Sequence, residues 1–291
     1  MKCSKGAIRA HSVQNSRFLD QLVRNGHVVN LTHSATLGKG LNVDFALIGR
    51  NKATTFTGLC SHHDNLIFTT IEKSELNFAV SEHLFMLAYR SAYRELHATM
   101  ETAAKLQAAY LERVERDLDS SNEPSPNSLF AVQRMMDYYD TFNYKSLLDT
   151  AHFDRDFQFL DHKVITFDTV RATVAVCALF SVDNIQVRED VLRIHLNVLP
   201  VSQTQTVVLF SYLKSDATPA CAFLGRVLGS GGLHQRYELS RLILDSCENF
   251  VLSPNYFDTW CDDKKNTIRD YFVRTIMKSD LGYESPHLYL F

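Results

Sequence analysis

The sequence has no apolar run long enough to cross a membrane, because no uninterrupted apolar stretch approaches the ~18 residues that a spanning helix needs. The first residues, Met1 to Gly6, contain no apolar segment of signal-peptide length, so export is not expected. Six cysteines in a chain of 291 residues do not predict a disulfide framework. These scarcities predict a cytoplasmic protein with reduced thiols and no membrane partner.

Proline and glycine are also scarce, at six and 11 residues, and the chain has a single tryptophan. Hydrophobic residues make up 45% of the chain and charged residues 22%, which excludes disordered, collagen-like and low-complexity proteins. At ~150 residues per domain, the length predicts about two domains.

The net charge of −3 conceals an asymmetry between the two ends of the chain. Residues 1–60 contain eight Lys/Arg and two acids, a net charge of +6, and the remaining residues carry a net charge of −9. A basic segment on an acidic body predicts a polyanionic partner, which we expect to be nucleic acid and specifically DNA. A chance fluctuation in composition is the alternative.

The pattern of apolar residues predicts three regions, 1–72, 73–155 and 156–291. The first is irregular, with short strands at 7–10, 27–31 and 43–48, a helical segment at 16–25 and a helix starting at 62. The second is helical, with segments at 81–118 and 129–148 separated by a Pro-containing linker near 119–127. One apolar stripe from Phe85 to Leu118 is expected to be buried, with a homodimer contact as one way to bury it.

The third region changes period, and we expect an α+β fold there. Four segments rich in β-branched and aromatic residues predict a sheet of three or four strands at 164–167, 172–182, 191–198 and 206–213. Helices at 220–228, 236–247 and 263–277 are expected to flank this sheet.

A possible metal site lies in the basic segment. Cys60 and His63 stand three positions apart at the start of a predicted helix, a spacing that lets two soft ligands grip one side of a tetrahedral zinc ion. Cys3 and His11 are the candidates for the opposite side. A structural zinc would explain how an irregular segment holds its shape. The alternative is that Cys3 is a terminal residue and that His62 and His63 are surface residues.

These residues resemble the HNH, or treble-clef ββα-metal, nuclease family over residues 1–72. The resemblance rests on a Cys before a strand, a His at the end of that strand, a basic loop, and Leu-Cys-x-x-His at a helix start. It implies a small zinc-stabilised, treble-clef-like module in which His11 is the general base of a DNA endonuclease. Asp64 would then be a ligand of a magnesium or manganese ion. Such modules are similar to components of bacterial anti-phage systems.

Two other functions stay open. Ala10 stands where the family has an acid or a second His, which favours a non-catalytic, zinc-stabilised adaptor or binding subunit of a multi-protein complex. His11 is then a zinc ligand rather than a base. Separately, Arg90 and His97 resemble the Arg-x4-6-His motif of HEPN ribonucleases, which implies a helical dimer acting on RNA. The ordinary alternative for that pair is a solvated or inter-helix face.

Overall fold

The structure is a computed structural model that describes residues 3–36, 40–182, 191–276 and 282–291. It contains helices and a large sheet in one chain, which confirms the predicted α+β class. None of the helices in these ranges is both long and apolar enough to span a lipid bilayer.

The N-terminal region contains two short strands, two strands of ten residues and one α-helix. Its elements are β1 (Arg9–His11), β2 (His27–Thr36), β3 (Gly40–Gly49), β4 (Thr55–Thr57) and α1 (Ser61–Glu72). The helix expected over 16–25 is wrong in extent, because only a 3-10 turn forms at Leu19–Gln21. Leu19 and Leu22 are still buried. Their apolar side chains pack in the core, but the segment is too short to propagate an α-helix.

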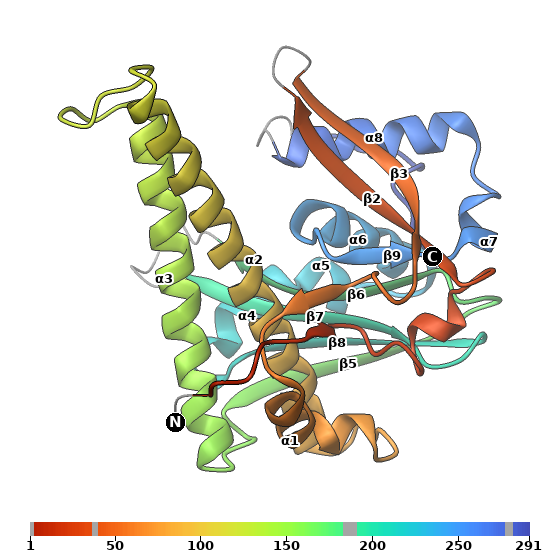
Figure 1. Cartoon of the computed structure of the whole chain (residues 1–291). Coiled ribbons are helices and arrows are strands. Elements are labelled where there is room, and N and C mark those ends of the chain that lie inside the picture. Colours follow the sequence, from red (N-terminus) through yellow and green to blue (C-terminus); the bar gives the residue numbers. More distant parts are fainter. Residues whose placement is uncertain (1–2, 37–39, 183–190, 277–281) are drawn as a thin grey trace.

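Two long helices form the middle of the chain, α2 (Ser81–Glu115) and α3 (Pro126–Phe153), and they pack side by side as a hairpin. Ser125 caps α3 by accepting from the Ser128 N–H at 3.1 Å, and the predicted linker lies in the non-helical connection. Figure 1 shows this hairpin standing along one side of the molecule, with its tip beyond the sheet.

The apolar stripe on α2 is buried only in part. Phe85, Tyr89 and Ala92 are buried, as expected, against the sheet and α3. Met100 and Leu118 are 44% and 60% exposed, so the prediction of burial is wrong for them. The sheet lies under the first half of α2, and the second half extends past it (Figure 1).

A seven-stranded antiparallel sheet is the centre of the fold. Its later strands are β5 (Leu160–Asp168), β6 (Val174–Val182), β7 (Leu192–Pro200), β8 (Gln205–Leu213) and β9 (Phe250–Leu252). The strand order is β3-β2-β9-β6-β7-β8-β5. The expected three or four strands were too few because β9 pairs with β2 on one side and β6 on the other. One sheet therefore contains strands from both sides of the predicted domain boundary at residue 72.

Both faces of this sheet are covered. Along β6, Val174 and Val176 belong to one apolar core, while Ala175 and Cys177 belong to the other, as the two-residue period of a strand requires. Helix α2 lies on the second face. The first face packs against the later helices, α4 (Ala217–Phe223), α5 (Gly225–Leu228), α6 (Gly232–Ser246), α7 (Pro254–Phe257) and α8 (Asp262–Ile276). A strand buried on both faces reads as a continuous apolar run.

Candidate metal centre and catalytic histidine

Strands β1 and β4 bring the two halves of the predicted site together. They pair antiparallel, with Arg9 opposite Thr57 and His11 opposite Thr55. The Ile8 N–H donates to the Leu59 carbonyl at 2.7 Å, which extends the pairing toward the start of α1. The paired strands therefore bring the chain that precedes β1 alongside the chain that leads into α1. At that end of the pair, Cys3 lies beside Cys60 and His63.

Three side chains form a cluster that suits a metal ion. The ligand atoms of Cys3, Cys60 and His63 all lie within 4.8 Å of one another. The two sulfur atoms are 3.6 Å apart, and the Cys60 Sγ lies 3.3 Å from the His63 Nδ1. Two thiols and an imidazole are donors that zinc prefers. The predicted fourth ligand, His11, is not part of this cluster.

The position of Cys60 favours its thiolate form. Cys60 is buried and is the N-cap residue of α1, where unpaired backbone N–H groups favour negative charge. Hydrogen bonding to the backbone of His63 is the largest influence and lowers the pKa of Cys60, with a smaller contribution in the same direction from the Cys3 side chain. A thiolate is the form that binds a metal.

His11 is held in one orientation at the end of β1. Its Nδ1 lies 3.0 Å from the carbonyl oxygen of Ala53. A carbonyl only accepts, so the Nδ1 carries the hydrogen, and the Nε2 of the neutral ring keeps its lone pair. Burial lowers the pKa of His11, which keeps the ring neutral near pH 7. A neutral, oriented imidazole with a free Nε2 is able to accept a proton.

Glu72 of α1 and Arg90 of α2 influence both His11 and Asp64. Asp64 is buried in the first turn of α1, and burial raises the pKa of its carboxyl group while Arg90 opposes that shift. The charges of Arg90 and Glu72 act on both His11 and Asp64. Arg90 donates to the Glu72 carboxylate at 2.6 Å.

Sequence reasoning missed Glu72, although a signal for it was present. Asp64, Phe68 and Glu72 recur every four residues and therefore lie along one face of α1. The Arg90 guanidinium lies 4.1 Å from the centroid of the Phe68 ring, between the two acids. The spacing of Asp64 and Glu72 predicts an acidic face on α1. Only the packing of α2 against α1 shows that the buried Arg90 contacts this face.

The alternative pair, Arg90 and His97, lies on α2 with its members roughly 10 Å apart along the helix axis. The Arg90 side chain is 3% exposed and is engaged by Glu72. The ring centroid of His97 lies 6.3 Å from that of Phe56. Arg90 therefore serves the acidic face of α1 and is not free to hold a phosphate.

The basic residues of the first 60 positions divide into two groups. Arg24 pairs with Asp258 and Arg50 pairs with Asp20, and Arg17 donates to backbone carbonyls near the end of α1. Within the described ranges, Lys5, Arg9 and Lys52 have no ion pair. Lys5 is close enough to lower the pKa of Cys60, so free positive charge lies beside the metal cluster.

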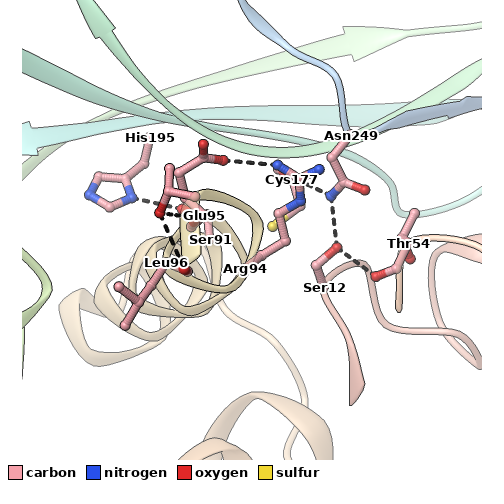
Figure 2. Close-up of polar contacts among 10 residues, drawn as sticks. Ser12, Thr54, Ser91, Arg94, Glu95, Leu96, Cys177, His195 and Asn249 are labelled. Carbon is pink, nitrogen blue, oxygen red and sulfur yellow. Dashed lines mark hydrogen bonds and ion pairs between the residues drawn. The ribbon is translucent and has the colours of Figure 1, made fainter. Parts of the chain in front are cut away.

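A buried polar network fixes this region to the sheet (Figure 2). The Ser12 hydroxyl donates to the Thr54 carbonyl at 2.9 Å and accepts from the Asn249 amide at 2.8 Å. The same amide donates to the Cys177 carbonyl of β6 at 2.7 Å. His11, the neighbour of Ser12, is thereby held relative to the central strands.

A second polar network lies between α2, α3 and the sheet. The His195 ring of β7 lies 2.7 Å from the Ser91 Oγ and 2.7 Å from the Tyr144 hydroxyl. Nearby, the Arg94 and Glu95 side chains form an ion pair at 2.9 Å (Figure 2). They line a cavity of about 560 Å³ whose wall includes Arg134, Asp137 and Arg193. Neither His11 nor Asp64 lines this cavity.

Compared with known proteins, the sequence matches no family model, no curated protein and no solved structure. The functional interpretation therefore depends on the residues themselves and on where the fold places them. Two placements matter most, namely the cluster of Cys3, Cys60 and His63 and the oriented ring of His11.

Proposed function

We propose that residues 3–72 form an HNH-like, zinc-stabilised module that binds DNA and hydrolyses its phosphodiester bonds, with His11 as the general base. The observation that carries the proposal is the fixed ring of His11, which donates from Nδ1 to the Ala53 carbonyl and leaves Nε2 free. The pairing of β1 with β4, followed by α1, supports the proposal, although β2 and β3 stand between the two strands in the chain and belong to the large sheet.

Zinc has a structural role in this proposal. Cys3, Cys60 and His63 would hold the ion, and their two thiolates would balance its charge. The ion would tie the chain before β1 to the first turn of α1. Three protein ligands leave one coordination position for water or a further donor.

The chemistry assigned to the chain is proton transfer. The Nε2 of His11 takes a proton from a water molecule as the water oxygen forms a bond to phosphorus and the bond to the leaving oxygen breaks. Asp64 is the residue that would hold a magnesium or manganese ion, which supplies Lewis-acid stabilisation of the phosphate charge. Lys5 and Arg9 are placed to contact the DNA backbone.

A non-catalytic, zinc-stabilised binding subunit is the second candidate. It is favoured by Ala10, which stands where the family has an acid or a second His, and by the absence of His11 and Asp64 from the described metal cluster. The HEPN-like ribonuclease has less support, because Arg90 is buried against Glu72.

Plasmid nicking tests the catalytic proposal. Wild-type protein should nick DNA in magnesium or manganese, and His11→Ala should lower the rate ~10²–10⁴-fold while zinc content and melting temperature stay unchanged. His27→Ala removes an exposed histidine of β2 and is the matched control. Binding of DNA by both proteins should weaken as salt rises.

The competing outcomes separate the candidates. Wild-type protein that binds DNA with salt dependence but never nicks it would support the binding subunit and contradict catalysis by His11. A His11→Ala protein that loses zinc and stability together would make His11 a metal ligand. Protein that does not bind DNA would contradict both candidates.

A further inference from the structure

The solvent side of α3 is unusually apolar over its first half. Six large side chains on this side are 44–61% exposed, and we call them the α3 outer face: Leu129, Val132, Met135, Met136, Tyr139 and Phe142. They recur at spacings of three and four residues, so they lie within an arc of roughly 140° on the helix. Large contiguous apolar patches mark sites of protein association.

The neighbouring helix has fewer exposed apolar residues. The exposed side of α2 carries charged residues, including the Glu101–Lys105 and Glu112–Arg116 pairs, and its exposed Met100 and Leu111 stand eleven positions apart. On α3 the exposed apolar residues are concentrated instead, although Phe130, which is 52% exposed, lies outside the α3 outer face.

The fold leaves this face open. Helix α3 packs mainly on α2, and Figure 1 shows it on the outer side of the hairpin, away from the sheet. Each half-exposed large side chain presents roughly 80–100 Å², so the face presents roughly 500–600 Å². With the stems of flanking side chains, this approaches the ~800 Å² per partner of a standard interface.

The α3 outer face is complementary to itself about a two-fold axis. An antiparallel pairing centred between Met135 and Met136 places Val132 against Tyr139 of the partner subunit. The same pairing places Leu129 against Phe142 of the partner subunit, so apolar side chains meet along its whole length. The contact is isologous, because the same patch of each subunit meets its own copy.

An ion pair inside this stretch of α3 lies away from the seam. Arg134 and Asp137 pair with nitrogen and oxygen 2.8 Å apart and line the cavity beside the sheet, on the opposite side of the helix. The proposed seam therefore buries neither member of this pair.

We infer that the chain forms a homodimer through the α3 outer face, with two helical hairpins packed as an antiparallel four-helix bundle. Short helical hairpins commonly bury their apolar faces in this way. The inference is independent of the proposed function, because none of its residues contacts the metal cluster or His11.

Oligomeric mass in solution tests the dimer. Wild-type protein at tens of micromolar should have twice the 33.2 kDa mass of the chain by light scattering or sedimentation. Val132→Glu should give a monomer with an unchanged circular dichroism spectrum, because it buries two unpaired charges at the interface. Leu111→Glu is the matched control on α2, since Val132 and Leu111 are both 51% exposed, and it should stay dimeric.

Cross-linking tests the register. Met136→Cys should give an oxidised dimer, since the two copies of position 136 lie about one residue apart along the seam. Leu129→Cys should not, because its two copies are roughly 20 Å apart along the helices. Wild-type protein reports the background from the exposed native cysteines.

A monomeric wild-type chain at 100 µM would overturn the inference and leave the face to a different protein or to a lipid surface. A dimer that survives Val132→Glu would overturn it as well, because the contact would then lie elsewhere. Equal cross-linking at positions 129 and 136 would contradict the antiparallel pairing.

Discussion

His11 and His195 lie in two regions of the molecule and differ in the hydrogen bonds that their rings make. Both rings are kept neutral because burial lowers their pKa, to about 3 for His195. Ser91 donates to the Ala88 carbonyl, so it accepts from the His195 Nδ1, and Tyr144 donates to the Nε2. His195 therefore has no free ring nitrogen, whereas among the described residues His11 has a hydrogen-bond partner at its Nδ1 alone.

The difference separates a structural histidine from a functional candidate. His195 is fully buried and joins β7 to α2 and α3 through satisfied hydrogen bonds. His11 lies at the end of a three-residue strand, where the charges of Arg90 and Glu72 act on its ring. Burial alone therefore does not distinguish a histidine with a structural role from a candidate for proton transfer, and the hydrogen bonds of both ring nitrogens have to be compared as well.

The largest expected effect is on the metal cluster. Wild-type protein should contain about one zinc per chain, and Cys60→Ser should lower this below ~0.2 and reduce the melting temperature by roughly 5 °C or more, because ligand binding contributes to folding. Cys261→Ser, at another free cysteine, should change neither quantity. Elemental analysis and calorimetry check both. Wild-type protein that contains no zinc would contradict the proposed metal site in the N-terminal region.

The next effect is on the buried network. His195→Ala should lower the free energy of unfolding by about 3–5 kcal/mol, since it leaves a cavity, the Tyr144 hydroxyl without its acceptor and the Ser91 oxygen without its donor. His27→Ala, at an exposed histidine, should change it by less than ~0.5 kcal/mol. Urea denaturation measures both variants. Zinc content should stay at the wild-type level in each, and a small effect of His195→Ala would contradict its structural role.

A smaller effect is expected at Arg90. Arg90→Met should lower stability by about 1–3 kcal/mol, because it leaves the Glu72 carboxylate, which is 25% exposed, without its cation. Arg116→Met removes one member of an exposed pair with Glu112 and should cost less than ~0.5 kcal/mol. If the wild-type protein cleaves RNA and both Arg90→Met and His97→Ala abolish this cleavage, the HEPN-like ribonuclease hypothesis would be supported instead.

The stability of the protein should also depend on pH. The folded-state pKa of His195 is about 3 and that of His162 about 4, both lowered by burial from 6.5. The unfolded chain therefore binds more protons between pH 6.5 and 4, and stability should fall as pH decreases through that window, by up to about 1.4 kcal/mol per pH unit for each group. The slope should flatten in His195→Gln and persist in His27→Ala. A flat wild-type profile would contradict the burial of both rings.

The sequence anticipated part of the candidate site. Cys60 and His63 were found because their spacing lies within one helix turn, where sequence distance and spatial distance agree. Whether His11 binds zinc or acts as a base had to stay open, because the answer depends on which acceptor faces its Nδ1. That acceptor, the Ala53 carbonyl, lies 42 residues away in the chain. Glu72 was missed for the same reason, since its cation comes from α2.

Local patterns determined most of the elements in this protein. Apolar spacings of three and four gave α2 and α3, and β-branched runs gave β5 to β8, because side-chain direction follows directly from the periods of helix and strand. The α+β class followed from their order. These features depend on residues that are close together in the sequence, so the sequence alone is enough to predict them.

Only the tertiary structure decided how distant segments meet. Strand β9 has three residues, too few to show a period, yet it joins β2 to β6 and makes one sheet from both ends of the chain. The register of β1 on β4 brought Cys3 to Cys60, and the reach of α2 past the sheet left the α3 outer face uncovered. Such contacts depend on the sum of packing over the whole chain, and no local pattern encodes that sum.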